Sequence, residues 1–65
     1  MATKGKIRDI MRMIEKDGWV QVDQRGSHRK FKHPTKHGSV TIPGHPSDDV
    51  APKTWDSIMR QAGLE

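Results

Sequence analysis

One histidine of this chain stands in a setting suited to proton transfer on a polyanion. His28 lies in a run from Gln24 to Ser47 that contains no Asp or Glu. The same run holds five cations and every histidine of the chain, namely Arg25, Arg29, Lys30, Lys32 and Lys36 with His28, His33, His37 and His45. An imidazole changes charge near neutral pH, and clustered cations attract phosphate groups. The pattern favours RNA as the ligand, with cleavage of its phosphodiester by proton transfer.

The length of the chain limits the kind of site that can carry this chemistry. With 65 residues we expect a single domain over residues 1–65, and a chain this short buries roughly 60% of the surface it exposes when unfolded. A large substrate pocket is therefore not expected, and an active site should lie open on the surface. Only 31% of the residues are hydrophobic, but they recur in helical and strand periods, which indicates a folded domain.

Composition also excludes several classes of protein. The absence of cysteine rules out disulfides and thiolate metal sites. No apolar run approaches the roughly 20 residues of a membrane span, and the first residues are not followed by the apolar segment of a signal peptide. We expect a soluble cytoplasmic protein without membrane contact.

Two amphipathic segments predict helices at the ends of the chain. The first is expected over residues 4 to 17, with Thr3 as N-cap and Gly18 as the stop. Its apolar stripe consists of Ile7, Ile10, Met11 and Ile14. The second is expected to start at Pro52 and to close at Gly63-Leu64. Its stripe consists of Trp55, Ile58, Met59 and Ala62.

Three short segments between the helices predict strands. They cover residues 19–23, 27–32 and 39–43, with a turn at 24–26 and a loop at 33–38. If Phe31 contacts the core, strand alternation points His28, Lys30 and Lys32 to the opposite, solvent side. By the same alternation Val40 and Ile42 face inward. The fold class is therefore α+β in the order α-β-β-β-α, a three-stranded antiparallel sheet with both helices on one face.

The chain resembles the HicA family of toxin ribonucleases along nearly its whole length. The resemblance is carried by Gly18-Trp19, by Gln24-Arg25-Gly26-Ser27-His28 with Phe31, by Lys32-His33-Pro34, and by Gln61-Ala62-Gly63-Leu64. It implies a double-stranded-RNA-binding-domain-like fold. It also implies the toxin of a type II toxin-antitoxin system, an endoribonuclease that cleaves mRNA, inhibits translation and is held in check by a HicB-type antitoxin.

The resemblance also assigns roles to single residues. The catalytic histidine of the family corresponds to His28, and Gly26 and Ser27 match the glycine and serine of its motif. Many members carry a second histidine where this chain has Arg29. The expected enzyme acts without a metal or a small-molecule cofactor, and we expect the antitoxin to cover the face that carries His28.

The residues expected to bind RNA surround His28 in the sequence. They are Arg25, Gly26, Ser27, Arg29, Lys30, Lys32 and Lys36. Lys30 and Lys32 have an equally good alternative role as a solvated strand edge that deters aggregation. A second basic stripe on the first helix is either a phosphate track or a solvated flank. It consists of Lys4, Arg8, Arg12 and Lys16.

Other readings of the sequence remain open. A metal site on His33, His37 and His45 is disfavoured because no cysteine or carboxylate completes it. Trp55 and Phe31 are expected in the core rather than stacked on bases, and Trp19 fits either role. Beside the metal-independent ribonuclease stand two alternatives. One is a non-catalytic RNA-binding module of the same fold, and the other is an interaction protein whose basic face binds an acidic partner.

Overall fold

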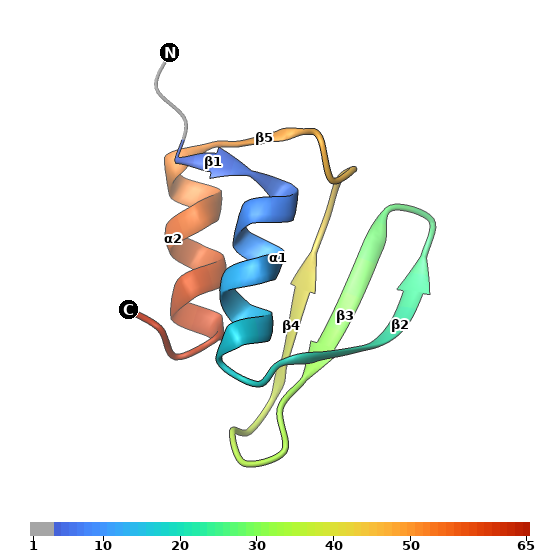
Figure 1. The fold of residues 1–65 in the computed structure, drawn as a ribbon, viewed down its shortest axis with the longest axis vertical. Coiled ribbons are helices and arrows are strands. Elements are labelled where there is room, and N and C mark those ends of the chain that lie inside the picture. The colour runs from blue at the N-terminus through green and yellow to red at the C-terminus, as the bar shows by residue number, and fades with distance from the viewer. Residues whose placement is uncertain (1–3) are drawn as a thin grey trace.

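The computed structural model describes residues 4–65, which form two helices, a three-stranded sheet and a two-stranded sheet (Figure 1). The elements are β1 (Gly5–Lys6), α1 (Ile7–Lys16), β2 (Val20–Arg25), β3 (His28–Lys32), β4 (Ser39–Ile42), β5 (Asp49–Val50) and α2 (Pro52–Gln61). The larger sheet is antiparallel in the order β2-β3-β4, and β1 pairs with β5. None of the helices described is long and apolar enough to cross a membrane.

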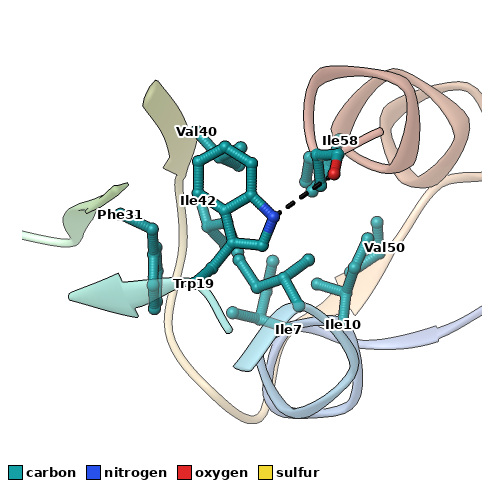
Figure 2. Packing of buried hydrophobic residues seen from close by; sticks show 10 residues of the cluster. Ile7, Ile10, Trp19, Phe31, Val40, Ile42, Val50 and Ile58 are labelled. Atoms are coloured by element: carbon teal, nitrogen blue, oxygen red, sulfur yellow. Dashed lines mark hydrogen bonds between the residues drawn. The ribbon is translucent and has the colours of Figure 1, made fainter. Parts of the chain in front are cut away.

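The two helices pack side by side against one face of the larger sheet (Figure 1). β4 lies next to them and β2 lies farthest away, so every residue of β2 is exposed. The core between the layers draws on both helices and on β3, β4 and β5 but not on β2 (Figure 2), and consists of Ile7, Ile10, Ile14, Trp19, Phe31, Val40, Ile42, Val50, Ile58 and Ala62. This arrangement confirms the predicted α-β-β-β-α architecture with one covered and one open face.

The first helix begins three residues later than the sequence indicated. Its N-cap is Lys6, whose backbone N–H donates to the Asp9 carboxylate at 2.8 Å. Two further N–H groups of the first turn, at Ile7 and Arg8, donate to the carbonyls of Asp48 and Pro46. These donors have no partner inside a helix, so the loop before β5 satisfies them. Thr3, expected as the cap, lies outside the described residues.

The pairing of β1 with β5 was not predicted. Gly5 lies opposite Val50 and Lys6 opposite Asp49, and the Lys6 ammonium contacts the Asp49 carboxylate at 2.7 Å. Strands of two residues are too short to show an alternating pattern in the sequence. They form here because the start of α1 and the approach to α2 meet in space, which also buries Val50.

The end of α1 follows the prediction closely. Gly18 adopts φ +108° and donates to the Glu15 carbonyl, while the N–H of Trp19 donates to the carbonyl of Ile14 at 3.1 Å. This pair of bonds is the Schellman motif, in which an apolar residue after the glycine packs back on the last turn. Trp19 therefore belongs to the helix end and not, as expected, to the first strand, which runs over Val20–Arg25.

Trp19 also ties the end of α1 to the end of α2. Its side chain is 2% exposed, and its indole N–H donates to the Ala62 carbonyl at 3.2 Å (dashed line in Figure 2). The second helix ends in the same motif as the first, with the N–H of Leu64 donating to Met59 at 2.9 Å. The predicted start at Pro52 and the predicted stop at Gly63 are both confirmed.

Gly18 should be the least replaceable glycine of the fold. A Cβ there would lie 2.8 Å from Nε2 of His33, and the φ of +108° is itself unfavourable for an L-residue. Gly26 also has a positive φ, +59°, but a Cβ there would have nothing within 4 Å. Gly26→Ala should therefore cost about 1 kcal/mol of unfolding free energy, the usual penalty of the left-handed conformation.

Gly18→Ala should cost at least about 1 kcal/mol more than this control, because the clash adds to the backbone strain. Unfolding in urea, monitored by circular dichroism, measures both variants against the parent. Equal losses at the two positions would show that His33 yields to the added methyl group.

Candidate functional site

The site is built on the hairpin of β2 and β3. The strands pair antiparallel with Arg25 opposite His28, so the turn consists of Gly26 and Ser27 alone. Gly26 takes φ +59° at the first turn position, which suits the two-residue turns of twisted hairpins. The Gln24 side-chain amide donates to the Gly26 carbonyl at 3.0 Å and holds the turn. His28 is thus fixed at the first position of β3.

A β-bulge in β2 decides which side chains accompany His28. The register shifts between Gln21 and Asp23, so that Gln21 lies opposite Phe31 while Asp23 lies opposite Lys30. A bulge inserts one residue and reverses the facing of all positions after it. Asp23 and its second neighbour Arg25 are therefore turned to the face of His28 rather than toward the helices.

On this open face the side chains surround a hollow of about 230 Å³. It is lined by Asp23, Gln24, Arg25, His28, Lys30 and Thr41. His28 is exposed, and none of the side-chain hydrogen bonds and ion pairs among residues 4–65 involves its ring. Both ring nitrogens are open to a ligand.

The charges around the hollow are mainly positive. The Arg25 side chain is 89% exposed, and its Nε lies 3.5 Å from the Asp23 carboxylate. The second oxygen of Asp23 accepts the Gln24 N–H at 2.8 Å. Lys30 lies between Asp23 on β2 and Thr41 on β4 in the sheet register. Two cations and one carboxylate therefore border the imidazole, an arrangement that can hold a phosphate beside a proton-transfer group.

Lys32 extends this cationic face along β3. It is exposed, as are His28 and Lys30, whereas Phe31 is fully buried. The observed alternation matches the prediction that these three polar side chains share the solvent side. Lys32 lies opposite Val20 and Ser39, toward the end of the sheet away from the hairpin turn.

Two of the predicted RNA-binding cations lie elsewhere. Arg29 points to the covered side of the sheet, where it is half-buried and donates to the Gly44 carbonyl at 3.0 Å. Lys36, in the loop after β3, contacts the Asp17 carboxylate and donates to the Ala62 carbonyl at 3.0 Å. The structure therefore engages both in holding the fold and does not bring them to the hollow.

His33 occupies a structural position beside Lys36. Its Nδ1 accepts the backbone N–H groups of Thr35 and Lys36, each at 3.1 Å. Its Nε2 lies 2.7 Å from the carbonyl oxygen of Asp17, so this nitrogen carries the proton and donates it. The ring also meets Trp19 edge-on at 5.3 Å. This histidine anchors the loop after β3 to the end of α1.

The remaining candidates are dispersed. Among residues 4–65 no three His, Asp or Glu side chains are grouped so as to hold a metal ion. Trp19 and Phe31 are buried in the core and present no ring for base stacking, and Trp55 is half-buried against the core. Arg8, Arg12 and Lys16 of the predicted basic stripe are exposed on α1, which packs on the face of the sheet opposite to the one that carries His28. Lys4 is exposed as well, but it precedes β1 and lies outside the helix.

Sequence reasoning missed three residues that line the hollow, Asp23, Gln24 and Thr41. Thr41 lies between the buried Val40 and Ile42, so strand alternation alone would have placed it on the face of His28. Asp23 carried no such signal. Counting by twos from Gln21, which lies opposite the buried Phe31, would place Asp23 on the covered face, and only the bulge reverses it.

Comparison with protein-family models matches residues 7–64 to the HicA toxin of bacterial toxin-antitoxin systems. The chain belongs to the HicA toxin family. No curated protein gives a significant match. The matched range contains the whole hairpin and every residue that lines the hollow. Membership in the HicA family makes the protein the toxin of a toxin-antitoxin pair, and it implies an antitoxin as partner.

The contact between Lys36 and Asp17 should make the stability of this HicA toxin depend on pH. The hydrogen bond from the Lys36 ammonium is the main cause that holds the pKa of the Asp17 carboxyl below its ordinary value of 3.8. A carboxyl with a lowered folded-state pKa stabilises the fold above its ordinary pKa, and this contribution is lost as the pH falls through the lowered value.

Asp17→Asn should therefore lower the thermal midpoint near neutral pH, and the curves of parent and variant should converge in acid. Thermal unfolding between about pH 7 and pH 2 tests this. Asp56→Asn is the matched control, because Asp56 is exposed and lies 3.6 Å from Lys4, and such surface pairs contribute about 0–1 kcal/mol. A difference for Asp17→Asn that persists unchanged into strong acid would contradict the assignment.

Proposed function

We propose that this HicA toxin is an endoribonuclease that cleaves mRNA with His28 and needs no metal ion. The observation that carries the proposal is the exposed imidazole of His28 in a hollow bordered by Arg25 and Lys30. Family membership supports the assignment as a toxin, and cleavage of mRNA is a direct way to stop translation.

The chemistry of RNA suits a site of this kind. RNA carries its own nucleophile, the ribose 2′-hydroxyl, next to every phosphodiester. Attack of this oxygen on phosphorus requires removal of one proton and delivery of another to the departing 5′-oxygen. An imidazole is effective in either step near neutral pH. His28 therefore acts as general base or general acid, and the products are a 2′,3′-cyclic phosphate and a 5′-hydroxyl.

The neighbouring cations bind the substrate and stabilise charge. Negative charge grows on the phosphate oxygens as the five-coordinate state forms, and nearby ammonium and guanidinium groups stabilise it. Lys30 and Arg25 line the hollow itself, and Lys32 continues the cationic face along β3. Open space around Gly26 and the polar Ser27 beside it allow backbone and hydroxyl groups to approach a phosphate.

The antitoxin partner is proposed to be a HicB-type protein that covers the open face of the sheet. Of the carboxylates in residues 4–65, one lines the hollow, so a partner with acidic residues would complement Arg25, Lys30 and Lys32. Covering His28 is sufficient for inhibition, because substrate RNA must reach the same imidazole.

Cleavage of RNA in EDTA is the direct test. The parent should fragment RNA in the presence of the chelator, and His28→Ala should lose at least about 100-fold in rate, the usual contribution of general acid-base catalysis. His37→Ala is the matched control, since His37 is exposed in the loop after β3 and should retain parent activity. Denaturing gels and identification of the cyclic phosphate end provide the readout.

DNA of the same sequence should remain intact, because it lacks the 2′-hydroxyl. Binding of RNA without cleavage by the parent would indicate the non-catalytic RNA-binding module, and weak binding even at low salt would indicate a protein-interaction role. Equal cleavage by the parent and His28→Ala would contradict the proposal.

The contribution of single cations should appear in the salt dependence of RNA binding. Binding is measured in the His28→Ala background, which keeps the RNA intact. Removing one phosphate contact lowers the slope of log affinity against log salt by about 0.7 for single strands. Lys30→Gln should show this change, whereas Lys53→Gln on α2 and Arg29→Gln on the covered face should not. A uniform change in all three would mean that only total charge matters.

A further inference from the structure

Among the residues described, Asp23 contributes the one carboxylate that lines the hollow. A negative charge is unexpected on a surface that binds phosphate. A carboxylate repels phosphate and lowers affinity for RNA. At this position it is nevertheless turned toward the hollow by the bulge in β2 and held by two contacts, with the Gln24 N–H at 2.8 Å and the Arg25 guanidinium at 3.5 Å. The position of the carboxylate is thus built into the hairpin.

The proposed reaction requires two proton transfers, and the hollow holds two groups suited to them. Guanidinium and ammonium groups are poor proton acceptors near neutral pH, whereas a carboxylate accepts protons and an imidazole both accepts and donates them. Of the side chains that line the hollow, this leaves Asp23 and His28. A general base and a general acid of different chemical type divide the two steps between them.

The sheet register places these two groups on a diagonal. Asp23 lies opposite Lys30, two positions along β3 from His28 and on the same face. Such diagonal neighbours are about 7–8 Å apart, within reach of side chains that meet on a common ligand. In an in-line reaction the entering 2′-oxygen and the departing 5′-oxygen lie on opposite sides of phosphorus. A phosphate seated between Asp23 and His28 would present one oxygen to each.

We propose that Asp23 is the general base of the reaction and that protonated His28 is the general acid. This inference rests on the proposed ribonuclease function. Asp23 takes the proton of the 2′-hydroxyl as the bond from O2′ to phosphorus forms. His28 gives its proton to O5′ as the bond from phosphorus to O5′ breaks. Asp23 then releases its proton to water and His28 takes one up, so the enzyme is restored.

The other groups that face Asp23 fit this role. They are Arg25 on the same strand, Lys30 and His28 on β3, and the uncharged Thr41 on β4. Arg25 and Lys30 compensate the carboxylate charge while the base is ionised. When Asp23 becomes protonated in the reaction, these cations are released to the phosphate oxygens, where negative charge is greatest.

The dependence of kcat on pH in Asp23→Asn tests the inference. The variant preserves size, and circular dichroism verifies its fold. We expect kcat to fall roughly 100-fold, the usual contribution of one such group, and the acid limb of the profile to disappear. RNA affinity should stay equal or increase, because a repelling charge is removed. Asp56→Asn, which removes an exposed carboxylate on α2, should behave as the parent.

A substrate with an activated leaving group separates the two roles. Uridine 3′-(4-nitrophenyl phosphate) expels nitrophenolate without the help of an acid but still requires removal of the 2′-proton. His28→Ala should regain most of its lost rate on this compound, and Asp23→Asn should remain impaired. The opposite pattern, with rescue of Asp23→Asn alone, would overturn the assignment of base and acid.

Three further results would overturn the role of Asp23. One is parent-like kcat and pH dependence in Asp23→Asn. The second is a loss of RNA affinity with kcat unchanged. The third is an identical fall of kcat in Asp23→Asn and Arg25→Gln with the acid limb retained, which would mean that the carboxylate only positions the guanidinium. In each of these cases His28→Ala can still be inactive, so the ribonuclease proposal stands or fails separately.

Discussion

The turn at the end of α1 is the constraint on which the rest of the structure depends. Gly18 reverses the chain, and Trp19 follows it into the core, where the indole N–H reaches the Ala62 carbonyl at 3.2 Å. The ring of His33 meets the same indole edge-on and binds the backbone at Asp17. Trp19 thereby connects the ends of both helices with the start of β2 and with the loop after β3.

This concentration of packing explains how the chain can carry an open site. Every residue of β2 is exposed, and Phe31 is the only buried residue of β3. The outer hairpin contributes little to the core, so its solvent face can carry Arg25, His28 and Lys30 without loss of buried contacts. Like charges on one face of a sheet repel each other. Asp23, placed opposite Lys30 by the bulge, offsets part of that repulsion.

The sequence predicted those parts of the fold that follow from local periodicity. The isoleucine stripe of α1, the alternation of Val40 and Ile42, and the helix stop at Gly18 each depend on neighbours close in the chain. The pairing of β1 with β5 and the bulge near Asp23 depend instead on where distant segments meet. The exposed side chains of β3, and Thr41 on β4, follow from simple strand alternation and were therefore predictable. Asp23 on β2 was not predictable, because the bulge reverses its facing.

The distribution of charge along the sequence predicted the surface around His28 least well. Closeness in the sequence does not determine on which face of the sheet a side chain lies. The run without carboxylates suggested a continuous basic surface around His28. In the structure Arg29 donates to the Gly44 carbonyl on the covered side, and Lys36 is held by Asp17 and Ala62. A carboxylate from outside the run, Asp23, enters the hollow instead. The cationic face is therefore smaller than the sequence indicates, and its one acidic group stands where the arrangement of charges matters most to a bound phosphate.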